Sequence, residues 1–159
     1  MRLLAIPFLL ATLLGCSGES TMPPGFNEAC YGGDFDTNLA GAKPIYSAEL
    51  TLDRPSRPVL LAMLAQLANE HRLKVFDEGA KYKEADLFLV YLCSSKGAFA
   101  FVDSRAAGPN AVRIVVFSYR NSWSSKSFAT DLDSKLSSEW PKNLKKLDPS
   151  STTLGNSIL

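Results

Sequence analysis

The sequence predicts an α+β fold: a two-layer sandwich in which two helices cover one face of a mostly antiparallel sheet of about five strands. Segments with alternating apolar residues, or with short β-branched runs, recur along the chain and are typical of strands. Two other segments repeat apolar residues every three or four positions, as amphipathic helices do. The connections are short and rich in Gly, Pro, Asn and Ser. The expected order is β-α-β-β-β-β-α, without an internal repeat.

The first strand and the first helix are separated by a proline-rich break. Residues 45–52 alternate apolar and polar side chains, which indicates a strand with one buried face. Residues 53–58 contain two prolines and end this strand, and Ser56 is a suitable N-cap for the helix that follows. Apolar residues then recur at helical spacing for about four turns, and the helix should end near His71, where positive charge is favourable.

Four more strands are expected before the second helix. Residues 73–76 form a short apolar strand, and residues 87–93 are apolar on both faces, which favours a central position in the sheet. Residues 94–97 have the composition of a hairpin connection to a strand at 98–102. Residues 112–119 are rich in β-branched side chains and complete the sheet.

The second helix is predicted from an apolar residue at every fourth position between Phe128 and Trp140. Asn121 and the serines around it are suited to the start of this helix. Pro141 should stop or kink it, and Leu144 and Leu147 are expected to extend its apolar stripe over a last turn.

The chain begins with Met1-Arg2 and an apolar run over residues 3–14, a layout typical of an export signal. The run is shorter than the 20 or so residues that a bilayer span needs. It ends in Leu13-Leu14-Gly15-Cys16. This motif resembles the lipobox of bacterial lipoproteins, which are cut before the cysteine and carry a diacylglyceryl group on its sulfur. The resemblance implies that residues 1–15 are a signal peptide and that Cys16 is lipidated. An ordinary signal peptide, followed by an unrelated cysteine, is the alternative.

The resemblance also implies a location in the cell envelope. Two or more acyl chains, such as palmitate, hold a protein firmly in a membrane, whereas one chain binds reversibly. Ser17, rather than aspartate, follows the cysteine. In lipoproteins of proteobacteria this favours the outer membrane, with the protein facing the periplasm. If that sorting rule does not hold in the source organism, the expected location is the inner membrane or the membrane surface of a Gram-positive cell.

The rest of the chain is expected to form one domain. Residues 16–44 read as a lipidated N-terminus and a tether rich in Gly, Pro and Ser, residues 45–147 as the domain, and residues 148–159 as a disordered tail. The sequence has 17 basic and 16 acidic residues, and Arg2 is the one charged residue of the leader. The mature chain is therefore neutral, which argues against a nucleic-acid binder and against a polybasic lipid-binding surface.

Two cysteines remain once Cys16 is assigned to the lipid. Cys30 and Cys93 are expected to form a disulfide in the oxidising periplasm, and closing this loop should stabilise the fold by about 4 kcal/mol. Two unpaired thiols are the alternative. Neither cysteine has a second cysteine or a histidine nearby in sequence, as a metal site usually requires.

Candidate chemistry is sparse, so we expect no enzyme activity, no catalytic residue, no metal and no cofactor. The single histidine, His71, is expected to be a solvated charge at a helix end. The acidic residues between positions 77 and 86 fit no known calcium loop and alternate with lysines, which favours a solvated loop. Asp103-Ser104-Arg105 is a common kind of polar turn. No phosphate-binding loop, nucleophile elbow or zinc pattern is present.

Binding is the function class that remains. Trp123 lies between serines and is the best candidate for an exposed aromatic that anchors a partner, although it could also fold under its loop and seal the second helix. An edge strand that accepts a partner strand is another route. The first hypothesis is a lipoprotein that binds a protein, as an envelope assembly factor, a secretion accessory or a toxin-neutralising partner. The second is a binder of a small apolar or glycan ligand between sheet and helices, and the third is a hydrolase using Ser104 or Asp103.

Overall fold

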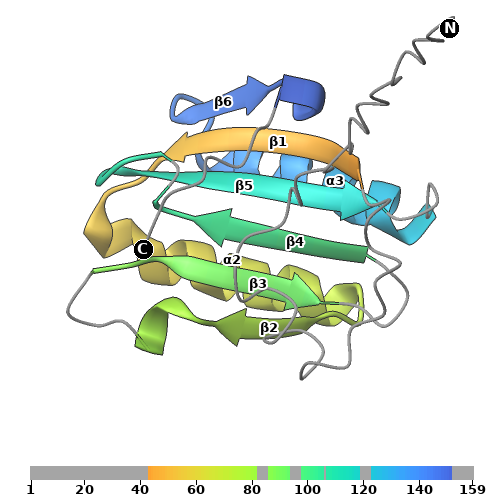
Figure 1. Ribbon diagram of the computed structural model, residues 1–159, viewed down its shortest axis with the longest axis horizontal. Helices are drawn as coiled ribbons and strands as arrows, with labels where there is room; N and C mark the ends of the chain where they lie inside the picture. The colour runs from red at the N-terminus through yellow and green to blue at the C-terminus, as the bar shows by residue number, and fades with distance from the viewer. Residues whose placement is uncertain (1–42, 82–85, 94–97, 106, 119–122, 152–159) are drawn as a thin grey trace, which may run out of the picture.

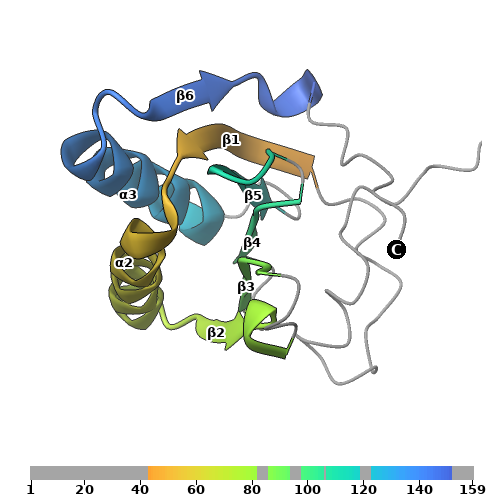
Figure 2. The same ribbon diagram turned by 90° about the vertical axis from the view of Figure 1, so that its left-hand side faces the viewer.

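Six strands and two helices form the two-layer α+β sandwich that the sequence predicts. The computed structural model describes residues 43–81, 86–93, 98–105, 107–118 and 123–151. In this part of the chain one antiparallel sheet has the strand order β2-β3-β4-β5-β1-β6. Helices α2 (Arg57–Glu70) and α3 (Trp123–Glu139) both cover the same face of the sheet (Figures 1 and 2). The order along the chain is β-α-β-β-β-β-α-β, one strand more than expected.

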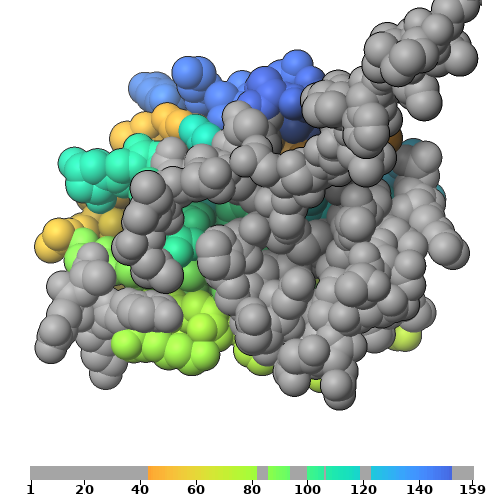
Figure 3. Space-filling model, viewed as in Figure 1, coloured from red at the N-terminus to blue at the C-terminus, as the bar shows by residue number. Residues whose placement is uncertain are grey.

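The strands follow one another across the sheet from β6 at one edge to β2 at the other (Figure 1), and Figure 3 shows the same view as a space-filling model. Their bounds are β1 (Lys43–Thr51), β2 (Lys74–Asp77), β3 (Leu89–Cys93), β4 (Ala98–Asp103), β5 (Ala111–Ser118) and β6 (Leu144–Leu147). All of the residues of β3 are buried, which confirms the burial on both faces that its composition predicts. The register of β1 against β5 shifts between Pro44 and Tyr46, so that Ile45 and Tyr46 both pack toward the helices.

The main core lies between the sheet and the two helices, and it is closely packed. Most of its side chains have no exposed surface, and each buried leucine or phenylalanine contributes about 1.5–3 kcal/mol of transfer free energy. The helices supply Leu60, Leu64, Leu67, Phe128, Leu132 and Leu136, and the strands supply Leu50, Val90, Leu92, Val102, Val112, Ile114 and Val116. Close packing of this kind disfavours the second hypothesis, a ligand held between these layers.

The start of α2 differs from the prediction in its capping residue. Ser56 occupies the N-cap position, but its side chain makes no capping hydrogen bond. The carboxylate of Asp53 instead accepts a hydrogen bond from the backbone N–H of Ser56, at 3.1 Å, and caps the short 3₁₀ turn η2 (Arg54–Ser56) that leads into the helix.

The predicted helical turn after Pro141 is wrong. Helix α3 ends at Glu139, and β6 follows as a sixth strand, paired antiparallel with β1 so that Leu144 lies opposite Leu50. The predicted disorder after residue 147 is also wrong for its first residues, because Pro149–Ser151 form a 3₁₀ turn, η4.

Several predictions fall outside the described residues. These are the leader, the tether with Cys16 and Cys30, the hairpin connection at 94–97 and the tail beyond residue 151. Among the described helices, none is long and apolar enough to cross a membrane.

Candidate contact surface

Trp123 is the most exposed large apolar side chain among the described residues. It is the first residue of α3, and 81% of its surface is accessible. The alternative, in which this tryptophan folds under its loop, is therefore wrong. Burial of such an exposed aromatic side chain against a partner removes a large apolar surface from water. Tryptophan is also among the residue types most enriched at the centres of interfaces.

The side of α3 that carries Trp123 continues into a groove. Trp123, Lys126, Thr130 and Asp133 are spaced by three, four and three residues, so they follow one another along one side of the helix. The last three line a surface groove of about 390 Å³ between α3, β1 and β6. We call it the α3–β6 groove, and its lining residues are Ile45, Tyr46, Lys126, Ala129, Thr130, Asp133 and Lys146.

The α3–β6 groove has an apolar floor and a charged wall. Lys146 of β6 reaches across to α3 and pairs with Asp133, with 2.7 Å between Nζ and Oδ2. Burial raises the pKa of the Tyr46 hydroxyl, and the negative charge of Asp133 adds to the shift, so this phenol stays protonated at neutral pH. Lys126 is exposed at the rim. The two lysines and one aspartate leave the groove with a net positive charge.

The edges of the sheet are poorly suited to strand addition. The edge strand β6 is four residues long and carries Lys145 and Lys146, and edge lysines oppose pairing with another strand. The opposite edge strand, β2, is equally short and has charged residues, Lys74 and Asp77, at its two ends. The side-chain surface at Trp123 is therefore better suited to a partner than either backbone edge.

A second groove, of about 420 Å³, lies between the outer sides of α2 and α3. It is lined by Val59, Ala62, Met63, Gln66, Lys135, Ser138 and Glu139. Val59 is about half exposed there. This groove has no aromatic residue, and it serves below as a comparison surface for the α3–β6 groove.

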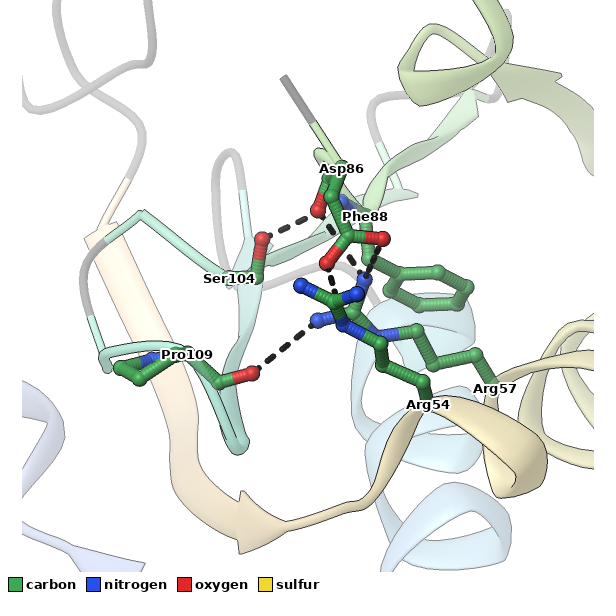
Figure 4. Close-up of polar contacts among 6 residues, drawn as sticks. All are labelled: Arg54, Arg57, Asp86, Phe88, Ser104 and Pro109. Atoms are coloured by element: carbon green, nitrogen blue, oxygen red, sulfur yellow. Dashed lines mark hydrogen bonds and ion pairs between the residues drawn. The ribbon is translucent and has the colours of Figure 1, made fainter. Parts of the chain in front are cut away.

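The densest polar cluster holds the fold together at the start of α2 (Figure 4). The Arg57 side chain is almost fully buried and donates to the backbone carbonyls of Asp86, at 3.0 Å, and Pro109, at 3.2 Å. Its guanidinium also lies 5.9 Å from the centre of the Phe88 ring. The Asp86 carboxylate receives Arg57 at 3.3 Å and the exposed Arg54 at 2.7 Å. These contacts join the first residue of α2 to the segments that precede β3 and β5, so we interpret the cluster as a structural clamp.

The polar turn after β4 is also engaged in structural contacts. Arg105 binds the buried carboxylate of Asp103 with its Nε, at 3.0 Å, and with its Nη2, at 2.7 Å. The Ser104 hydroxyl oxygen accepts the backbone N–H of Phe88, at 3.1 Å. Asp103 and Ser104, the residues of the third hypothesis, are thus both engaged in contacts within the fold.

His71 is not the solvated charge that its position suggests. Its side chain is 16% exposed, its Nε2 lies 2.9 Å from Oδ2 of Asp131, and its ring packs edge-on against Phe128. It therefore joins the end of α2 to α3.

The acidic residues around position 80 are separated by their own contacts. Asp77 accepts the backbone N–H of Ala80, Glu78 pairs with Lys81, and Asp86 belongs to the clamp. In the described ranges, no three potential metal ligands come together.

Cys93 lies on the face of the sheet opposite the helices and forms a disulfide bond. Its side chain belongs to a buried apolar group with Leu89, Tyr91 and Phe101. Cys30, the partner that the sequence predicts, lies outside the described residues, as does Cys16.

Comparison with known proteins does not assign a family. No protein-family model matches the chain, and no match to a curated protein is found.

Proposed function

We propose that the chain is an exported lipoprotein, held at a membrane of the cell envelope by the lipid on Cys16, that works without catalysis by binding a protein partner. The motif Leu13-Leu14-Gly15-Cys16 supports the anchor. The disulfide at Cys93 supports export, because disulfides persist in oxidising compartments and are rare in the cytosol. Ser17 favours the outer membrane, with the domain facing the periplasm.

The observation that carries the binding proposal is the exposure of Trp123 at the end of the α3–β6 groove. A solvent-exposed tryptophan next to an apolar floor gives a partner one large anchor and a neighbouring depression to fill. The net positive charge of the groove favours an acidic segment of the partner over a basic one. Envelope assembly, assistance to secretion and neutralisation of a toxin all fit a surface of this kind.

The test is capture of a partner from solubilised membranes with the acylated protein, comparing Trp123→Ala with Val59→Ala. Both replace an exposed apolar residue near a helix N-terminus, so both should leave the fold intact. We expect Trp123→Ala to lower recovery of the partner by tenfold or more, as hot-spot residues do, and Val59→Ala to retain it. Equal recovery with both variants would contradict the proposal.

A small-ligand binder is the second candidate, and the α3–β6 groove rather than the protein interior would be its site. The groove volume falls in the range of ligand pockets, and Ile45, Tyr46 and Ala129 supply apolar surface. Titration of the mature domain with an acidic glycan or a fatty acid distinguishes the two candidates. Saturable binding that Thr130→Trp abolishes, without any protein partner, would favour this second function, because Thr130 is exposed and lines the groove.

A further inference from the structure

The face of the sheet opposite the helices has a buried apolar centre over β3 to β5, bordered by Lys74, Asp103 and Arg113. Six residues form its centre, and none is more than 3% exposed: Leu89, Tyr91, Cys93, Phe101, Val115 and Phe117. We call them the rear cluster. Both helices lie on the other side of the sheet, and no helix in the described ranges covers the rear cluster (Figure 2). An open antiparallel sheet with an uncovered side normally presents polar residues there.

The disulfide identifies which part of the chain reaches this face. Cys93 belongs to the rear cluster and is disulfide-bonded. The chain has three cysteines, so within one molecule its partner is Cys16 or Cys30. Both precede β1, and a lipid on Cys16 leaves Cys30.

The sequence around Cys30 suits a cover for an aromatic face. Phe26, Tyr31, Phe35 and Leu39 lie on both sides of it, within a segment otherwise rich in small and polar residues. Aromatic side chains at this spacing can pack against Tyr91, Phe101 and Phe117, whose burial requires apolar neighbours.

We propose that the segment between the lipidated cysteine and β1 docks on the rear cluster and is fastened there by a Cys30–Cys93 disulfide, which makes it a short tether that turns the α3–β6 groove away from the membrane. The orientation rests on the proposed lipoprotein function, whereas the docking does not. From Cys16 to Cys30 the chain spans at most about 50 Å when fully extended. Without the fastening, the chain from Cys16 to Lys43 could span about 95 Å.

The docking is tested by mapping disulfide-linked peptides of the full mature chain without reduction. A link between Cys30 and Cys93 within one chain supports the proposal. A link between Cys16 and Cys93 would overturn both this proposal and the lipid anchor. A link between two chains would show that a second copy covers the rear cluster, and would overturn the docking alone.

Limited digestion tests the cover itself. Chymotrypsin should cut after Phe26, Tyr31 and Phe35 roughly tenfold faster in Cys30→Ser than in the natural chain, because docked segments are cut only when they open locally. Cys16→Ser, in the same mature chain, removes a cysteine without removing the fastening and should leave the rate unchanged. Equal and rapid cleavage of both variants would overturn the docking, and equal and slow cleavage would overturn the fastening by the disulfide.

Fluorescence in vesicles tests the orientation. The lipidated Trp140→Phe chain, whose emission comes from Trp123, is placed in phosphatidylcholine vesicles that contain brominated acyl chains. We expect Trp123 to be unquenched, and a tryptophan introduced by Ser17→Trp, with both natural tryptophans replaced, to be quenched. Strong quenching of Trp123 would overturn the orientation while leaving the disulfide result unaffected. If the disulfide and quenching results are as expected but no partner is captured from membranes, the proposed function is contradicted and the tether is not.

Discussion

Arg57 shows how a single residue can be indispensable without any sign in the sequence. It lies in the proline-rich break after β1, and its side chain is almost fully buried. The carbonyl groups that it binds belong to Asp86 and Pro109, which are far away along the chain. Burial of an arginine depends on such distant acceptors, and neither composition nor periodicity reveals them.

Replacing Arg57 with alanine should lower the free energy of unfolding by about 2–3 kcal/mol, because two partly buried carbonyls lose their donor and the Phe88 ring loses its cover. Asp86→Asn is the matched change on the other side of the pair. It keeps the carbonyl bonds and suits the positive φ of 48° at this position, so it should cost about 1 kcal/mol or less. Urea denaturation of both variants checks the order, and an equal loss would contradict the clamp.

Tyr91 should make the free energy of unfolding depend on pH in the alkaline range. Burial raises the pKa of its hydroxyl from 10.0 in the unfolded chain to about 12 in the fold. Between these values the unfolded chain has lost the proton that the folded chain still holds, so the free energy of unfolding falls as the pH rises from about 10 to 12. Tyr91→Phe should show a smaller fall over this window. Denaturation curves at pH 9 and pH 11 measure it, and an unchanged fall would contradict the assignment to Tyr91.

The two residues that carry the candidate surface differ in how far the sequence could predict them. Trp123 is identifiable as a candidate because tryptophan among serines is unusual in a core, but its exposure follows from the position of α3 on the sheet. Lys146 is not identifiable as a groove residue, because its pairing with Asp133 requires that the chain return to the sheet after α3. The groove thus depends on the packing of β6 beside β1 and α3, and the periodicity of the sequence did not predict β6.

Among the elements, β6 was predicted wrongly because its two leucines have a helical spacing. Leu144 and Leu147 are three residues apart, a helical spacing, and they continue the stripe that ends at Trp140. In the strand they point to opposite sides, and only Leu144 packs against the core under the helices. Pro141 is the one local sign that the helix ends. By contrast, α2 and β3 were predictable because a sustained period, or an unbroken apolar run, permits one interpretation.

The role of β6 can be tested by comparing its inward and outward residues. Leu144→Ala should lower the free energy of unfolding by about 1–2 kcal/mol, because Leu144 is partly buried against the core. Lys145→Ala should change it by less than about 0.5 kcal/mol, because Lys145 is exposed. Thermal unfolding of both variants gives the comparison. If Leu144 and Leu147 lay on one helical stripe, Leu147→Ala would cost as much as Leu144→Ala.

The whole molecule has two sides that differ in the residues they carry. One side carries the helices, Trp123 and the α3–β6 groove, and the other carries the rear cluster and the disulfide of Cys93. The sheet separates these two sides. The sequence could predict its fold class but not its strand order, because strand neighbours depend on long-range pairing. A tether attached to the rear side and a binding surface on the helical side would let one domain face its membrane and its partner at the same time.

A lipid anchor on Cys16 would fix the position of the entire chain at a membrane. Mass spectrometry of the native protein should find no residues 1–15 and a diacylglyceryl group on Cys16. Each buried methylene contributes about 0.8 kcal/mol, so two or more chains hold the protein through an alkaline carbonate wash. The matched control carries Cys16→Ser behind a cleavable signal peptide of the ordinary secreted type, so that export continues without the lipid. This control should leave the membrane fraction completely. Its persistence there, or an unmodified Cys16 in the native chain, would show that the domain reaches the membrane by another route.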